Sequence, residues 1–325
     1  MRILLIHNAK LPVEQYGGTE RVLWWLAKGL SELGHDIVLG LRPGSSCPYA
    51  SKVVSVDFAS AINEKALPAA DITHYFFTPS HAPTHPHLIN IHGNGKAGEV
   101  FLPNTVFISA DHAGRHGAQA FVHNGIDPDD YVYREAKGAE LLFLAKASWK
   151  VKNLKGSRRI ARRAGRELRV LGGSCIFPWA NPGVHFMGMV GGAEKSKYLA
   201  ESLALIFPVR WAEPFGLAVV EALVSGTPAL VSPFGAMPEI VDDEVGRVCH
   251  SETEMVEVLR NWPGFSSARC RDRVLSRFHY RKMAEGYLRF YEKVLGGEKI
   301  NASAPRSLPV DSTIFKGLPD GFIFE

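Results

Sequence analysis

The sequence predicts an α/β protein of two domains, each with a parallel sheet. Short apolar runs alternate with segments whose apolar residues recur at helical spacing along most of the chain. A length of 325 residues is typical of two domains. Hydrophobic residues make up 46% and charged residues 22%, which is typical of a globular α/β protein.

The first 41 residues form a β-α-β pattern. Residues 1–6 and 36–41 are apolar strands, and residues 20–33 carry one apolar side at helical spacing. Such a unit requires a parallel pair of strands with a right-handed crossover. Gly17 and Gly18 lie between the first strand and its helix, where glycine lets the backbone approach a diphosphate, although the pair also fits a simple turn. The spacing is not G-x-G-x-x-G, which disfavours a dinucleotide-binding dehydrogenase.

The rest of the first half alternates strands with helices. We expect strands at 52–56, 72–77, 87–91, 105–108 and 120–122, and helices at 59–67 and 111–119. Four histidines occur between residues 81 and 92, but the intervening prolines prevent the i,i+4 spacing of helical zinc sites, so we predict no metal. His92 ends a strand and precedes a glycine, which places it at the sheet edge where ligands bind; the alternative is an ordinary surface histidine.

The second half repeats the alternation from residue 139. Strands are expected at 139–145, 167–171, 184–187, 203–209 and 229–232, and helices at 153–165, 193–202, 217–225, 253–261, 271–277 and 281–295. Residues 146–169 hold ten Lys or Arg and one acid, Glu167. Most such charge runs are solvated faces, and the other reading is contact with an anionic ligand or membrane.

Two acids stand out in the stretch WAEPFGLAVVEALVSGTP at residues 211–228. Glu213 lies on the turn that precedes a helix, and Glu221 lies about one and a half turns into that helix. A helix start directs free N–H groups toward hydroxyls, carboxylates or phosphates at the end of the preceding strand. An acid there can accept hydrogen bonds from sugar or ribose hydroxyls. The plain alternative makes Glu221 the wet side of the helix and Glu213 its cap.

This stretch resembles the E-x7-E segment of retaining GT-B glycosyltransferases of family 4, the glycosyl transferases group 1. YGGTERV near residue 19 and HNGIDP near residue 125 resemble further segments of the same family. The resemblance implies that Glu213 and the amides of Phe215, Gly216 and Leu217 hold the donor sugar. It also implies that Glu221 holds the nucleotide ribose and that His92 contacts the sugar near its reacting carbon.

The resemblance extends to the donor diphosphate and the base. It implies that Lys146 and Lys152, with the Gly17–Gly18 loop, contact the diphosphate, and Lys150 and Lys155 remain rivals because this loop is long. The family usually has arginine at the first position, so Lys146 is a departure that keeps the charge and loses the bidentate fork. Met189 and Val190 correspond to residues that line the base. Two cations and a helix start can neutralise a leaving diphosphate without a metal.

The implied fold is GT-B, two Rossmann-like domains whose parallel sheets face a central cleft. We expect an N-terminal acceptor domain at 1–125 and a nucleotide-sugar domain at 126–280. A helix at 281–297 packs back on the first domain, and a tail follows at 298–325.

The implied function is metal-independent transfer of a sugar, with retention of configuration, from a nucleoside-diphosphate sugar (UDP-, GDP- or ADP-linked) to a saccharide or lipid-linked acceptor. Two alternatives stay open: a nucleotide-sugar epimerase of GT-B fold and a non-catalytic nucleotide-sugar-binding protein. No cofactor and no nucleic-acid partner are expected, and no nucleic-acid-binding signature is present.

The expected location is the cytoplasm, with peripheral contact to an anionic membrane as a further option. The four cysteines are scattered without a C-x-x-C pair, which is typical of thiols in a reducing compartment. No apolar run reaches the roughly 18 residues that a membrane span needs.

Overall fold

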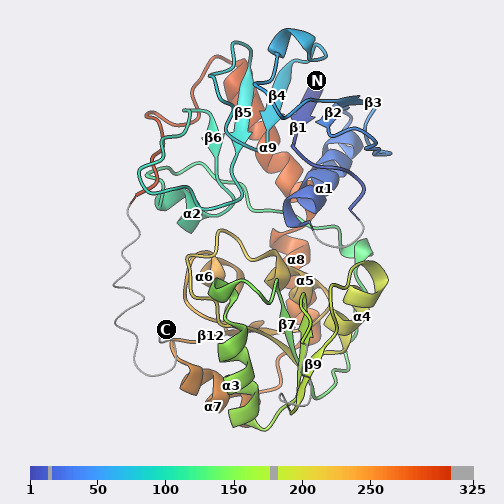
Figure 1. Cartoon of the computed structure of the whole chain (residues 1–325), viewed down its shortest axis with the longest axis vertical. Coiled ribbons are helices and arrows are strands. Elements are labelled where there is room, and N and C mark those ends of the chain that lie inside the picture. Colours follow the sequence, from blue (N-terminus) through green and yellow to red (C-terminus); the bar gives the residue numbers. More distant parts are fainter. Residues whose placement is uncertain (14–16, 176–181, 309–325) are drawn as a thin grey trace. The chain divides into compact units, whose positions relative to one another are not determined.

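The computed structural model describes residues 1–13, 17–175 and 182–308 (Figure 1). Within these residues the chain forms two compact units. The first comprises Met1–Val13, Gly17–Ile126 and residues 278–308, and the described part of the second lies in Asp127–Arg277. The chain therefore leaves the first unit, builds the second, and returns to complete the first.

The first unit contains a six-stranded sheet in which every neighbouring pair is parallel. Its strands are β1 (Arg2–Ile6), β2 (Asp36–Leu41), β3 (Lys52–Ser55), β4 (Ile72–Tyr75), β5 (His87–Asn90) and β6 (Thr105–Val106). The order β3-β2-β1-β4-β5-β6 is that of a Rossmann fold. The strand order reverses between β1 and β4, and ligands bind beyond the carboxyl ends of the strands at such a reversal.

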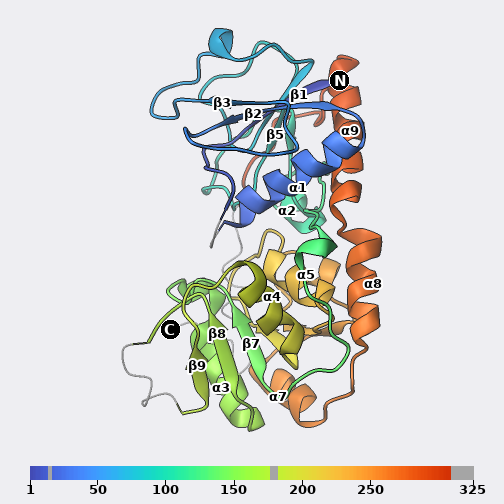
Figure 2. The same ribbon diagram turned by 90° about the vertical axis from the view of Figure 1, so that its right-hand side faces the viewer.

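Helices α1 (Gly18–Glu32) and α9 (Tyr280–Leu295) pack together in the first unit (Figure 2). Gly29 allows this approach, because a Cβ there would lie 2.9 Å from the Cβ of Ala284. The Tyr291 hydroxyl of α9 lies 2.7 Å from Nδ1 of the buried His74 on β4. Helix α9 is thus part of the core of the first unit. The first unit also contains the short helix α2 (Ala110–Gly114).

The second unit contains another six-stranded parallel sheet. Its strands are β7 (Leu141–Leu144), β8 (Leu168–Leu171), β9 (Val184–Phe186), β10 (Ala204–Phe207), β11 (Ala229–Val231) and β12 (Gly246–Val248). The order β12-β11-β10-β7-β8-β9 repeats the topology of the first sheet, because β7 corresponds to β1 and β10 to β4. Its reversal lies between β7 and β10.

The helices of the second unit are α3 (Leu154–Ala164), α4 (Gly192–Glu201), α5 (Leu217–Val224), α6 (Met237–Ile240), α7 (Glu252–Arg260) and α8 (Ser267–Arg277). The core forms where strands β7, β8, β10 and β11 meet α3 and α7. Helix α5 is buried over almost its whole length and packs against α8 and β10. Among the helices of the described residues, none combines the length and the apolar character that crossing a bilayer requires.

Two parallel α/β domains confirm the predicted fold class, while some predicted elements differ. The expected helix at 59–67 is only a 3-10 turn, Glu64–Ala66, capped by Asn63. Ile62 and Leu67 of this segment, with the preceding Phe58, pack on the sheet without regular helix. The helix expected at 111–119 ends at Gly114, and the strand expected at 120–122 is a single bridge between Phe107 and Phe121. Strand β12 was not predicted, because three residues give too short a pattern.

Candidate active site

The loops that follow β7 and β10 are tied together at the sheet reversal of the second unit. The side chain of Asn153 donates to the Pro208 carbonyl at 2.9 Å, and the Arg210 amide donates to the Val151 carbonyl at 2.7 Å. Asn153 has a left-handed backbone, which asparagine tolerates, and it also caps α3 through the Gly156 amide. These bonds bring Lys152, in the loop after β7, close to Glu213, in the loop after β10.

Lys152 and Glu213 form a buried ion pair. The Lys152 ammonium donates to Glu213 Oε2 at 2.6 Å, and the Trp211 indole N–H donates to the same oxygen at 2.6 Å. The Lys152 ammonium also lies 4.9 Å from the Trp211 ring centre and 5.3 Å from that of Phe207. Both charged side chains are about nine-tenths buried. One carboxylate oxygen of Glu213 is therefore held by the protein, and the other keeps acceptor capacity.

Glu221 is held in the same manner. Lys195 from α4 donates to Glu221 Oε1 at 2.6 Å, and the Tyr131 hydroxyl donates to that oxygen at 2.6 Å. The side chains of Lys195 and Glu221 are 8% and 7% exposed. This burial excludes the plain alternative that Glu221 is the wet side of its helix.

The start of α5 lies directly beside Glu213. Gly216 is the residue before the helix and has a φ of 98°, which favours glycine. The backbone at Gly235 packs against Glu213 so closely that a Cβ on residue 235 would lie 2.2 Å from the Glu213 backbone. Phe215 is buried and Leu217 is half-buried, so the first-turn amides are fixed by packing before any ligand arrives. Such amides favour an anion or a hydroxyl.

The other residues predicted for the donor lie at the surface or in separate loops. Lys146 follows β7, is exposed, and lies 5.7 Å from the Trp149 ring centre. Met189 is 43% exposed and Val190 is half-buried, both after β9. Rivals Lys150 and Lys155 are also exposed.

In the first unit, Gly17 and Gly18 begin α1 after β1. Gly17 is buried, and a Cβ there would meet both Val13 and Glu20 at 2.9 Å. Gly18 is exposed and is the first residue of the helix. A side chain at position 17 would therefore displace the side chains of Val13 and Glu20, whatever the loop binds.

His92 belongs to an aromatic stack at the carboxyl edge of the first sheet. The Phe76 ring lies between the imidazoles of His92 and His74, with ring centres 5.5 Å and 4.6 Å apart and interplanar angles of 14° and 19°. Burial, and next the nearby His7, lowers the pKa of His92 to about 3. His92 is therefore neutral at physiological pH, and its buried Nε2 has no hydrogen-bond partner among the described residues.

A hollow of about 600 Å³ lies at the carboxyl ends of β1, β2 and β3. Asn8, Arg42 and the segment Ser55–Ala59 line it. The Arg42 Nε donates to Asn8 Oδ1 at 2.7 Å, which fixes the guanidinium against the first strand's end.

The comparisons with known proteins give a family match for one segment and similar solved structures for most of the chain. Residues 180–262 match the sequence profile of the family Glycosyl transferases group 1. The matched segment includes α4, α5 and both acids with Lys195, whereas Lys152 and His92 lie outside it.

Solved glycosyltransferases share the fold. A glycosyltransferase involved in Avilamycin A biosynthesis superposes with a TM-score of 0.75 at 24% identity, over 91% of this chain and 98% of that one. The Anabaena protein HepE, solved in complex with UDP-glucose, superposes with a TM-score of 0.64 at 14% identity, over 91% of this chain and 100% of that one. The fold is GT-B.

The curated relatives match smaller parts of this chain than the solved structures do. An uncharacterized 41.2 kDa protein in the cps region of Klebsiella pneumoniae is 29% identical over 34% of this chain. An uncharacterized glycosyltransferase of Methanocaldococcus jannaschii is 35% identical over 20% of this chain. The aligned parts span only 32% and 16% of these two relatives.

The structure thus brings Lys152, Glu213 and the start of α5 together at one sheet edge. Sequence reasoning missed the partners of the acids, which are Trp211, Tyr131 and Lys195. One signal was present: Lys195 lies four residues before the buried Leu199 and hence on the apolar side of its helix.

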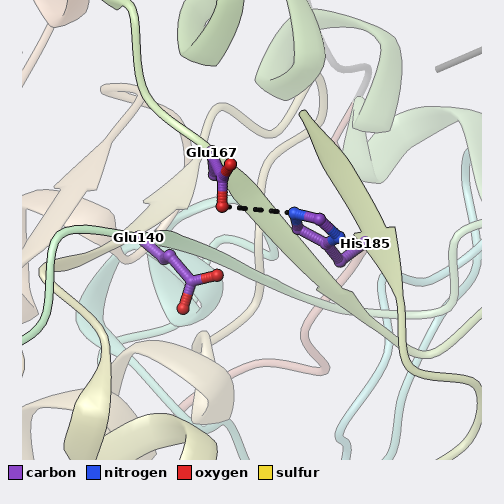
Figure 3. A group of neighbouring side chains, drawn as sticks. All are labelled: Glu140, Glu167 and His185. Carbon is purple, nitrogen blue, oxygen red and sulfur yellow. Dashed lines mark hydrogen bonds and ion pairs between the residues drawn. The ribbon is translucent and has the colours of Figure 1, made fainter. Parts of the chain in front are cut away.

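A group of possible metal ligands lies elsewhere in the second unit (Figure 3). Glu140 and Glu167 precede β7 and β8, and His185 lies on β9, so the group is at the amino edge of the sheet, opposite to the two acids. Figure 3 shows the Glu167 carboxylate turned toward His185, 3.3 Å from Nε2. The guanidinium of Arg169 already pairs with Glu140, and we assign the group no function.

Proposed function

We propose that the protein is a retaining glycosyltransferase of family 4 that moves a sugar from a nucleoside-diphosphate sugar to a saccharide or lipid-linked acceptor, without a metal ion. The observation that carries this proposal is the pair Glu213 and Glu221, each held through one oxygen by two buried donors beside the start of α5. The match of this segment to the group 1 family supports it.

In the proposed mechanism, Glu213 and the amides of Phe215–Leu217 hold the donor sugar and Glu221 holds the ribose. Ordered acceptors and donors of this kind cost no reorganisation when the bond breaks. Lys146 and the Gly17–Gly18 loop contact the diphosphate. Lys152 assists as the counter-charge that holds Glu213 in place, and His92 contacts the sugar as a neutral imidazole. Met189 and Val190 line the base.

Retention follows when the acceptor hydroxyl attacks the anomeric carbon on the face from which the diphosphate leaves. The new carbon–oxygen bond forms as the bond to the leaving phosphate breaks, and the hydroxyl proton passes to a phosphate oxygen. Glu213 and Glu221 do not flank a scissile bond in this scheme, unlike the two carboxylates of a glycosidase.

A nucleoside-diphosphate donor is supported by the fold neighbour HepE, which was solved with UDP and with UDP-glucose. For the acceptor, we propose the hollow beside Arg42 in the first unit, which has a volume suited to one or two sugar rings. The fixed guanidinium favours an acceptor with an anionic group.

Peripheral membrane contact is a further proposal. Helix α3 carries exposed Lys155, Arg162 and Arg163, whereas Arg159 is paired with Glu252 through two hydrogen bonds. The Arg163 guanidinium donates to the Thr253 hydroxyl at 3.1 Å and keeps its charge. Three exposed cations support weak binding to anionic lipid, about 1 kcal/mol each. Sedimentation with vesicles tests it: equal binding to anionic and neutral vesicles contradicts it.

The decisive experiment measures release of nucleoside diphosphate. The full chain is first screened by thermal shift against UDP, GDP and ADP, since a bound ligand raises the melting temperature. The matching nucleotide sugars are then incubated with saccharide and lipid-linked acceptors, with and without EDTA. We expect acceptor-dependent release that EDTA leaves unchanged, and a product with the donor's anomeric configuration by NMR.

The matched variants are Glu213→Gln, expected to lose at least 100-fold in kcat, and Glu257→Gln on the exposed face of α7, expected to be unaffected. A changed nucleotide sugar without acceptor identifies an epimerase, and nucleotide binding without turnover identifies a binding protein. Either result contradicts the proposal.

A further inference from the structure

The environment of Glu221 contains more than the ribose contact requires. The acid lies on α5, Lys195 on α4, and Tyr131 follows the 3-10 turn Pro128–Asp130. Three separate parts of the chain, 90 residues apart at the extremes, thus converge on one carboxylate oxygen. Glu221 Oε1 accepts from both donors at 2.6 Å, the short distance typical of charge-assisted bonds.

The convergence is itself braced. The Val132 amide donates to Ser196 Oγ at 2.6 Å, so the segment of Tyr131 is bonded to the residue after Lys195. The Lys195 ammonium lies 5.6 Å from the Tyr131 ring centre. The two donors therefore support each other, and neither can shift without the other losing contacts.

The charges of Lys195 and Glu221 offset each other, so this buried pair carries no net charge. A carboxylate whose charge is already compensated suits hydroxyl donors better than it suits a cation. The remaining lone pairs of the carboxylate can accept from the 2′- and 3′-hydroxyls of one ribose. Because the protein already holds one oxygen, the direction of the other is set before the nucleotide binds.

We propose that Lys195 and Tyr131 are positioning residues that orient Glu221 and thereby set the preference of the site for ribonucleotides over deoxyribonucleotides. This inference rests on the proposed function, in which Glu221 holds the ribose. It adds that the selectivity comes from the two donors behind the acid and not from the acid alone.

The magnitude follows from the bond that is lost. A hydrogen bond to a charged group contributes enough to change an affinity by roughly 10- to 150-fold. The same loss applies to a 2′- or 3′-deoxy analogue when the acid is correctly oriented. When the donors to Glu221 are removed, the carboxylate no longer points at the ribose, and the affinity for the ribonucleotide falls. The affinity for the deoxy analogue changes little, because the analogue lacks that hydrogen bond already.

The experiment uses the full chain and the nucleoside diphosphate, among UDP, GDP and ADP, that gives the largest thermal shift. Calorimetry then measures Kd for that ribonucleotide and for its 2′-deoxy and 3′-deoxy forms. The variants are Tyr131→Phe, which removes only a hydroxyl, and Lys195→Met. The matched controls are Lys197→Met and Tyr198→Phe, on the same helix α4; Lys197 is exposed.

We expect the wild type to prefer the ribonucleotide by 10-fold or more. Tyr131→Phe lowers this ratio by about 3- to 10-fold and Lys195→Met brings it close to one, with affinity for the deoxy forms changed less than threefold. Both controls keep the wild-type ratio. A purely structural role would instead weaken ribo and deoxy forms equally, and that result overturns the proposal.

The outcomes separate this inference from the function on which it rests. A wild type that binds ribo and deoxy forms equally refutes the selectivity device while glycosyl transfer stands. A wild type that binds no nucleoside diphosphate refutes both. Should Lys195→Met fail to fold by circular dichroism, Tyr131→Phe decides, since it leaves the buried ion pair intact.

Discussion

The buried pair Lys152–Glu213 makes a sharp prediction about stability. In Lys152→Met, the Trp211 indole is the one side-chain donor left to Glu213 among the described residues, while the Glu213 side chain stays about nine-tenths buried. Removing one partner of a buried pair costs about 3–5 kcal/mol, because the other charge is left uncompensated. For a unit of this size, each kcal/mol lowers Tm by roughly 2–4 °C, so a fall of about 6–20 °C follows.

The assay is a set of four proteins measured by urea unfolding. The double variant Lys152→Met/Glu213→Gln removes both charges and should recover at least half of the loss. Lys150 and Lys152 lie in one 3-10 turn, Lys150–Lys152, but Lys150 is exposed, so Lys150→Met should stay within about 0.5 kcal/mol of the wild type. Hydrogen exchange should localise the loss to residues 127–277. If the free energies of unfolding of Lys152→Met and Lys150→Met differ by less than 1 kcal/mol, the buried pair does not stabilise the second unit in this way.

Three further predictions concern acid, backbone and acceptor. Burial lowers the pKa of His112 to about 2, well below the 6.5 of the unfolded chain. The unfolded state therefore takes up the proton first, and stability falls by about 2 kcal/mol between pH 7 and pH 5; His112→Gln should flatten this part of the pH-stability curve. Gly216→Ala should cost about 1–3 kcal/mol, because alanine at a φ of 98° is strained and its Cβ meets the Met237 methyl; unchanged thermal unfolding would refute this. Arg42→Ala should raise the KM for an anionic acceptor about 10-fold and leave the KM for the donor within twofold; equal effects on both in steady-state kinetics would remove the hollow from consideration.

Local pattern sufficed for most of the fold. Helix α5 follows from apolar residues at helical spacing between Gly216 and Gly226, and the strand β10 before it is a short run of buried residues. Where the pattern was weak, tertiary packing decided: residues 59–67 have apolar residues that fit one face of the sheet without forming a helix. The two acids could be found because one short motif holds both.

The partners of the acids could not be found in that way. Tyr131 and Glu221 are 90 residues apart, and Lys152 and Glu213 are 61 apart. Only the fold brings them together, at the edge where the strand order reverses. The sequence selected Lys152 for its charge and assigned that charge to a diphosphate, whereas the structure shows it paired with Glu213. A lysine can therefore contribute to a binding site by fixing a carboxylate as well as by contacting the ligand.

The return of the chain at residue 278 has a consequence for biosynthesis. Ile126 and the segment at 278–280 are bonded side by side, and α9 then covers α1. The described residues of the second unit all emerge from the ribosome earlier than this covering helix. The second unit can therefore fold first. The N-terminal part of the first unit keeps one apolar side uncovered until α9 is translated. A nascent chain stalled before residue 278 would offer that open side to chaperones.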